Sequence, residues 1–219
     1  PGRSVVGGIK YKDINNDGVI TNGGDQDDRT IIGNPFPDFT YGITNSFRYK
    51  NWDMDIVGSG SQGNQLWVRH LYSTANLDGV FNMVRKANDR VRVQKTDNGW
   101  VMTDPGAGIF GQTAGMDGNL TGLERDWNSS HFLQDASFFT IKNITLGYTF
   151  PAVNKFFNSA RVYASVQNAY VFTKYWGGNN PETSGNGGGN GDGGNLSQGV
   201  DWSNYPVPRT FTLGVNLNF

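Results

Sequence analysis

The sequence predicts an all-β protein, a transmembrane antiparallel β-barrel with long extracellular loops, and three observations carry that prediction. The final stretch, residues 209–219, alternates apolar and polar side chains over a length that suits an outer-membrane strand. Four earlier stretches, about 38–50, 52–62, 137–150 and 160–173, alternate in the same way. Long and short connections follow one another between these stretches, as they do between the two ends of a membrane barrel.

The final stretch has one apolar and one polar face. Successive strand side chains point to opposite sides, so every second residue shares a face. The apolar face carries Phe211, Leu213, Val215, Leu217 and Phe219. The other face carries only threonine, glycine and asparagine. We therefore expect the apolar face to meet lipid and the polar face to line the lumen.

The first pair of stretches predicts a β-hairpin. Residues 38–50 and 52–62 alternate on either side of a tight turn at Lys50 and Asn51. Tyr49 and Trp52 flank that turn, where an aromatic girdle would lie at the membrane interface.

The second pair of stretches predicts another two strands. In 137–150 the alternation changes register at Lys142 and Asn143, which indicates a β-bulge, and Pro151 ends the strand. Residues 160–173 then alternate again without interruption.

The long connections are expected outside the cell, with the C-terminus in the periplasm. Loop parity places residues 13–28, 64–135 and 174–207 on the extracellular side. Within 64–135 the spacing of Leu66, Trp67 and Leu71 predicts a short helix, and 80–86 predicts a second.

Composition narrows the possible functions. The 219 residues carry a formal net charge of -1, so no basic surface points to nucleic acid. The sequence has no cysteine, which excludes disulfides and thiolate metal sites. No run of about 18 apolar residues predicts a transmembrane helix, and the 31 glycines favour strands and loops.

The acidic segment 13–28 resembles the first half of a calcium loop. Oxygen-bearing residues recur at alternate positions and a glycine follows at Gly18, but the closing position is occupied by Gly24. An Asx-rich turn is the alternative. The candidate ligands of a structural Ca²⁺ are Asp13, Asn15, Asp17, the backbone of Val19, Asp25, Asp27 and Asp28.

Catalysis is not expected, and no cofactor other than this structural calcium is predicted. The only glutamates are Glu124 and Glu182, and the only histidines are His70 and His131. Neither pair forms the local cluster that a glycosidase, a zinc site or a triad requires.

Aromatic residues of the external loops are the candidates for substrate contact, since aromatic faces beside polar groups suit sugars and peptides. The alternative is that these rings pack the loops together or contact a partner protein. The candidates are Trp67, Tyr72, Trp100, Trp127, His131, Tyr175 and Trp176.

Six segments, in this order along the chain, resemble the C-terminal barrel portion of SusC/RagA-type TonB-dependent outer-membrane transporters. They are spread over nearly the whole chain, from residue 11 to residue 214. The segments are 11–18 (YKDINNDG), 27–35 (DDRTIIGNP), 37–42 (PDFTYG), 139–151 (FTIKNITLGYTFP), 161–168 (RVYASVQN) and 205–214 (YPVPRTFTLG).

The resemblance implies that residues 1–219 are the last five or so strands of a plugged barrel of about 22 strands. It implies import of oligosaccharides or peptides by a multi-pass protein of the bacterial outer membrane. The expected partners are the remaining barrel and plug segments of the same transporter, a SusD-like surface lipoprotein that acts as a lid, the TonB system through an N-terminal part, and outer-membrane lipid.

A secreted calcium-binding β-sandwich, serving adhesion or carbohydrate binding, is the alternative. Strand length and loop parity favour the barrel, because a sandwich has no reason to alternate long and short connections.

Overall fold

The computed structural model describes residues 11–21, 23–74, 82, 84–89, 92–105, 129–151, 158–182, 198–203 and 205–218. The chain divides into two compact units, which are described separately. The first contains Pro1–Gly33, Trp67–Leu133 and Val200–Ser203. The second contains Asn34–Leu66, Gln134–Gly199 and Asn204–Phe219.

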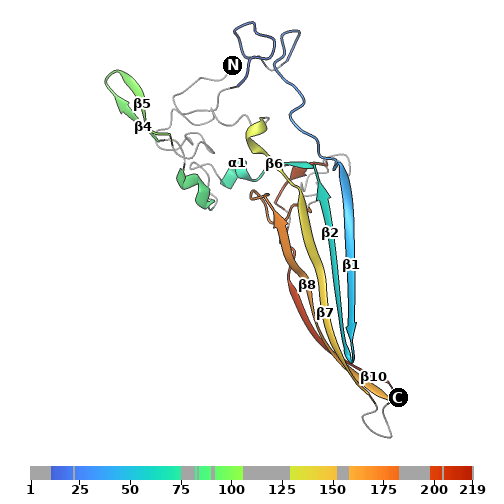
Figure 1. The fold of residues 1–219 in the computed structure, drawn as a ribbon. Coiled ribbons are helices and arrows are strands. Elements are labelled where there is room, and N and C mark those ends of the chain that lie inside the picture. The colour runs from blue at the N-terminus through green and yellow to red at the C-terminus, as the bar shows by residue number, and fades with distance from the viewer. Residues whose placement is uncertain are drawn as a thin grey trace. The chain divides into compact units, whose positions relative to one another are not determined.

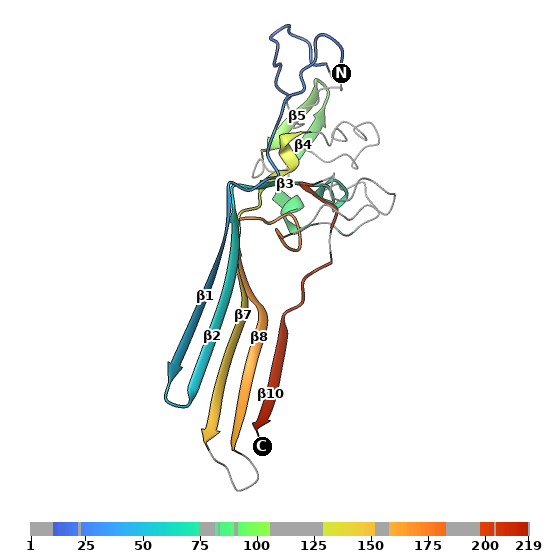
Figure 2. The ribbon, with the colours of Figure 1, turned by 90° about the vertical axis from the view of Figure 1, so that its right-hand side faces the viewer.

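The second unit is built on an antiparallel sheet of five long strands in the order β1-β2-β7-β8-β10, which we call the wall (Figures 1 and 2). The strands are β1 (Phe39–Tyr49), β2 (Trp52–Gln62), β7 (Phe138–Pro151), β8 (Ser159–Thr173) and β10 (Thr210–Asn218). All five predicted strands are confirmed, with ends that differ by a residue or two. The sheet is open, so these strands alone do not close a barrel.

The local features predicted from the pattern are also present. Lys50 adopts a left-handed φ of 53° in the turn between β1 and β2. The pairing of β7 with β8 shifts between Ile141 and Asn143, which confirms the β-bulge. The bulge adds one residue to β7, so Ile141 and Ile144 lie on the same face although they are three positions apart.

The register of the wall collects the apolar side chains on one face. Residues paired across antiparallel strands share a face, and the pairing joins Phe47 to Met54, Met54 to Leu146, and Leu146 to Ala164. The last step pairs Ala164 with Leu213, whose side chain is 84% exposed. An apolar face therefore runs without a break from β1 to β10, and it has no cover within the described residues.

Aromatic rings gather at both ends of the apolar face. At the end near the long connections, Tyr41 stacks on Phe139 at 5.9 Å and Phe139 stacks on Phe172 at 6.2 Å. At the end near the Lys50 turn, the rings of Trp52 and Tyr148 lie 4.8 Å apart. We call these groups the loop-end and turn-end aromatic clusters.

Polar and charged side chains occupy the opposite face of the wall. Arg48, Asp53, Asp55 and Arg161 are charged side chains of this face. The hydroxyl of Ser46 donates a hydrogen bond to Asp55 across the first hairpin at 2.5 Å. Each strand of the wall thus separates an apolar side from a polar side.

The other described elements are short, and most of their residues belong to the first unit. β3 (Gln65–Val68) pairs in parallel with β9 (Val200–Asp201) through Trp67 and Val68. α1 spans Leu71–Thr74, and β4 (Arg92–Thr96) and β5 (Gly99–Asp104) form a hairpin. The remaining elements are a 3-10 helix at Arg85–Asp89, a second at Ser130–Phe132, and the strand β6 (Leu133–Asp135).

The predicted helix through Leu66, Trp67 and Leu71 is partly wrong. Leu66 and Trp67 belong to strand β3, and only Leu71 begins a helix. The reason is a pairing with β9, more than a hundred residues away in sequence, that local spacing cannot reveal. Residues 80, 81 and 83 of the second predicted helix lie outside the described residues, residues 82 and 84 are not helical, and the 3-10 helix at Arg85–Asp89 overlaps only the end of the predicted range. No helix within the described ranges is long and apolar enough to span a membrane.

Candidate substrate and ion sites

Trp67 and His131 both contact the ring of Phe132 in the first unit. The Trp67 ring meets Phe132 edge-on at 6.4 Å, and His131 meets it edge-on at 4.9 Å. Burial lowers the pKa of His131 below its ordinary value of 6.5, because desolvation disfavours the imidazolium. The structure thus brings together two predicted contact residues and one, Phe132, that sequence reasoning missed.

Tyr175 and Trp176 lie in residues 174–182, which we call the strap. The backbone N–H groups of Trp176 and Gly177 both donate to the side-chain oxygen of Gln134, at 3.2 and 3.1 Å. At the other end of the strap, Glu182 forms an ion pair with Lys142 of β7. The strap is therefore held near both of its ends, by Gln134 and by Lys142.

The two aromatic residues of the strap differ in accessibility. The Tyr175 side chain is only 7% exposed, and its backbone N–H donates to the hydroxyl of Thr173 at 3.0 Å. Trp176 is half-buried, so part of its ring faces outward. Of these two predicted contact residues, Trp176 is the more available to a ligand.

The other aromatic candidates cannot be placed at the level of side chains. Tyr72 belongs to α1 and Trp100 to β5, but their side chains are outside what the structure describes. Trp127 lies outside the described residues. Substrate contact by any of the aromatic candidates stays a prediction.

The first half of the acidic segment folds around Asp13. Its two carboxylate oxygens accept hydrogen bonds from the backbone N–H groups of Asn16, at 2.6 Å, and Gly18, at 2.8 Å. Gly18 has a φ of 84°, a left-handed conformation that glycine adopts without a steric penalty. Asn15 and Asp17 accept from the N–H groups two positions onward, as Asx-turns do.

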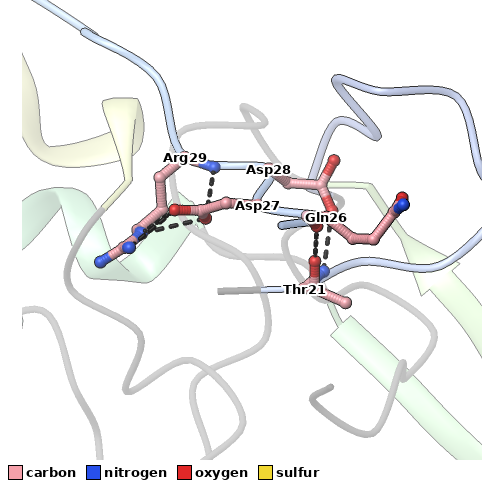
Figure 3. A network of polar contacts seen from close by, with 5 residues as sticks. All are labelled: Thr21, Gln26, Asp27, Asp28 and Arg29. Atoms are coloured by element: carbon pink, nitrogen blue, oxygen red, sulfur yellow. Dashed lines mark hydrogen bonds and ion pairs between the residues drawn. The ribbon is translucent and has the colours of Figure 1, made fainter. Parts of the chain in front are cut away.

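The second half of the segment is held by Asp27 and Asp28. Figure 3 shows Asp27 directed at the guanidinium of Arg29, and the Thr21 hydroxyl directed at the backbone oxygen of Gln26. Hydrogen bonding from Arg29 lowers the pKa of Asp27. The N–H groups of Thr21 and Ile14 lower the pKa of Asp28 by donating to its carboxylate.

The calcium hypothesis stays a prediction. Asp25 is exposed, Asp27 is paired with Arg29, and Asp28 fastens the two ends of the segment. Within the described ranges, no three acidic or histidine side chains are grouped closely enough to hold a metal ion. A cation bound by the residues of the first half would therefore need further ligands from backbone, amide or water oxygens.

An ion pair that sequence reasoning missed crosses the polar face of the wall. The Arg161 guanidinium of β8 reaches over β7 to Asp53 of β2, with Nε donating to Oδ1 at 3.0 Å. A Cβ on Gly147, the β7 residue between them, would lie 2.5 Å from the guanidinium. The glycine therefore makes room for the side chain that links strands on both sides of it. Only the register could have shown that these three residues are neighbours.

Known proteins related in sequence are TonB-dependent receptors. The chain is 33% identical to TonB-dependent receptor P26 of Formosa agariphila over 98% of its own length, which is 20% of that protein. It is 30% identical to TonB-dependent receptor SusC of Bacteroides thetaiotaomicron over 95% of its length, or 17% of SusC. The chain thus spans about one fifth of these relatives. A search against family models finds no match.

Solved structures support the same assignment at the level of the fold. The RagAB peptide importer in its closed-closed state superimposes with a TM-score of 0.57 and 22% identity, over 86% of this chain and 18% of that one. The open-open state gives a TM-score of 0.55 at 23% identity. The wall therefore has the fold of a barrel segment. The chain belongs, as a segment about one fifth the length of its relatives, to the SusC/RagA-type TonB-dependent receptors.

Proposed function

We propose that the protein containing this chain imports oligosaccharides or peptides across the bacterial outer membrane, driven by TonB, and that this chain is part of its barrel wall. The relatives are named as receptors and an importer rather than as enzymes, so transport is the activity that we assign. The substrate class follows from the SusC/RagA resemblance and from RagAB, which is named as a peptide importer.

The two-faced wall is the observation that carries this proposal. A lipid-facing strand needs an apolar band about 25 Å tall with aromatic girdles at both edges. Phe139 and Tyr148, from the loop-end and turn-end aromatic clusters, lie nine positions apart on β7. At about 3.4 Å per residue and a tilt of about 40°, they would be separated by roughly 23 Å along the membrane normal. The apolar face of the wall therefore has the height of a bilayer core.

The charges of the wall support the same orientation. Arg48, Asp53 and Asp55 lie on the polar face between the levels of the two aromatic clusters, and Arg161, one position beyond the turn-end cluster, reaches back to Asp53. A charge at the same depth on the lipid side would cost several kcal/mol, whereas a lumen can hydrate or pair it. We therefore assign the polar face to the lumen, the Lys50 turn to the periplasm and the long connections to the cell exterior.

The partners follow from this assignment. The exposed edges of β1 and β10 would pair with further strands of the same protein, because lipid tolerates no unpaired strand edge. A SusD-like lipoprotein would cover the extracellular end as a lid, a role supported by the closed and open states of RagAB. The resemblance implies that a plug and a TonB-contacting segment would be supplied by other parts of the same transporter.

Fractionation and uptake in the source bacterium test the proposal. We expect the full-length protein in the outer-membrane fraction, extractable only with detergent, and we expect its deletion to abolish growth on the oligosaccharide or peptide that it imports. The same growth defect should follow deletion of TonB. A soluble, monomeric protein that stays folded without detergent would contradict the barrel, as would normal growth of the deletion strain on every such nutrient tested.

A further inference from the structure

A pocket of about 180 Å³ lies between the strap and the extracellular end of the wall, within the second unit. The strap contributes Asn179, Asn180 and Glu182 to its lining. The wall contributes Thr140 from β7, and the segment that leads into β10 contributes Arg209. The pocket lies at the end of the wall that carries the long connections, which we assign to the cell exterior, so an external ligand could reach it before it passes the barrel.

The charges around the pocket favour an anion. The carboxylate of Glu182 is paired with Lys142, so its charge is already compensated. Arg209 lines the pocket as well, and among the described residues no acidic side chain forms an ion pair with it. A guanidinium presents its donors in a planar fork that matches a carboxylate. Arg209 is therefore the cationic lining residue that can pair with a negatively charged ligand.

A buried hydroxyl in the same lining indicates an unfilled polar contact. Thr140 is 1% exposed, and its Oγ1 has no hydrogen-bond partner among the described residues. A buried polar group without a partner destabilises the folded protein, because it has lost its hydrogen bonds to water. A ligand oxygen that accepts from this hydroxyl would remove that destabilisation.

The segment that carries Arg209 is fixed to the wall before any ligand arrives. Asn168 of β8 has a left-handed φ of 51°, and its Nδ2 donates to the backbone oxygen of Pro208 at 3.0 Å. This bond lies directly beside Arg209 in the chain. A pre-positioned cation loses less entropy on binding than one on a free segment.

From this geometry we propose that the pocket binds a carboxylate of the imported ligand, with Arg209 as the cationic partner and Thr140 as a hydrogen-bond donor. The inference rests on the proposed import function and names a chemical feature of its substrate. A peptide would supply the group at its C-terminus, and an acidic oligosaccharide would supply it as a uronate. The shared chemistry is the carboxylate, and the ligands used in the test separate the two sources.

Calorimetric titration of the detergent-purified full-length transporter tests this inference. The probes are trialanine against its C-terminal amide, and glucuronate against glucose. We expect at least one acid to bind about tenfold more tightly than the compound in which an uncharged group replaces the carboxylate, which we call its neutral analogue, because hydrogen bonds between charged groups are the strong ones. Preference for trialanine over its amide identifies a peptide source, and preference for glucuronate over glucose identifies a uronate source.

Three variants assign that preference to the pocket. Arg209→Gln should abolish it, and Thr140→Val, which keeps the side-chain shape, should weaken it severalfold. Lys174→Gln is the matched control, since it removes an exposed cation of the strap that does not line the pocket. Equal binding of acids and neutral analogues, no binding of either acid at millimolar concentration, or equal losses in the arginine and lysine variants would each overturn the inference. Normal uptake alongside any of these results would leave the proposed import function standing.

Discussion

Placing an arginine at the centre of the apolar face is the most direct test of the wall's orientation. Ile144 lies on that face, four positions from Tyr148 and five positions from Phe139. With about 3.4 Å per residue and a tilt of about 40°, it is roughly 10–13 Å from either aromatic cluster. Ile144 is therefore close to the expected bilayer midplane.

At that depth the free energy of unfolding should fall markedly in Ile144→Arg. An arginine on the lipid face at the midplane costs about 2–4 kcal/mol, which lowers the folding equilibrium constant about 30- to 700-fold. The same substitution at Ser165 is the matched control, because Ser165 pairs with Thr145 at nearly the same depth but lies on the polar face. We expect its effect to stay below about 1 kcal/mol, since a lumen side chain remains hydrated.

The assay is guanidinium unfolding of the full-length protein in phospholipid, read by the mobility of unboiled samples on gels. Ile144→Ala measures the loss of the isoleucine side chain by itself, so the contribution of the charge is the difference between the two Ile144 variants. Equal losses in Ile144→Arg and Ser165→Arg, or a larger loss in Ser165→Arg, would refute the assignment of the apolar face to lipid.

Three further perturbations test separate features. Gly147→Ala should lower the free energy of unfolding by about 1 kcal/mol, because the added Cβ displaces the Arg161 guanidinium from its ion pair. Gly42→Ala is the control: its added Cβ would have its nearest neighbour at 3.8 Å, so its effect in the same unfolding assay should be close to zero. Burial lowers the pKa of His131, so the unfolded state takes up the proton first as the pH falls. The free energy of unfolding should therefore decrease as the pH drops below about 6.5. His131→Gln should flatten this pH dependence, as measured by urea titrations. The calcium hypothesis predicts that Ca²⁺ slows proteolysis within 13–28, and that Asp13→Ala removes this protection; equal cleavage rates with Ca²⁺ and with a chelator would reject it.

The strands of the wall could be predicted from the sequence because each of them has one apolar face and one polar face. A strand between lipid and a polar lumen must alternate, and even the β-bulge is visible as a change of register at Lys142 and Asn143. Loop parity also predicts which end of the wall faces the cell exterior, and that orientation stays a prediction.

The first unit was harder to predict because its order depends on distant partners. β3 forms by pairing with β9, and the apolar spacing of Leu66, Trp67 and Leu71 fits a helix equally well when that partner is unknown. The β4 and β5 hairpin was missed because its strands are short and largely polar, without a long alternating pattern.

The candidate sites were predicted only by residue type. Aromatic and acidic residues could be named from the loops, but the grouping of Trp67 and His131 around Phe132 depends on tertiary contacts. In the same way, the contact of Arg161 with Asp53 depends on two successive strand registers. A pattern of single residues carries no information about such pairs.

The long connection between β2 and β7 has a consequence for how such a protein can diversify. These strands pair directly although 75 residues separate Gln62 from Phe138. Closing a loop costs entropy that grows only with the logarithm of its length, so doubling this connection would add about 0.6 kcal/mol. Insertions and deletions in the connection should therefore change the free energy of pairing β2 with β7 very little. In the proposed orientation, the surface formed by this connection can therefore change in length and sequence while β2 and β7 keep their pairing.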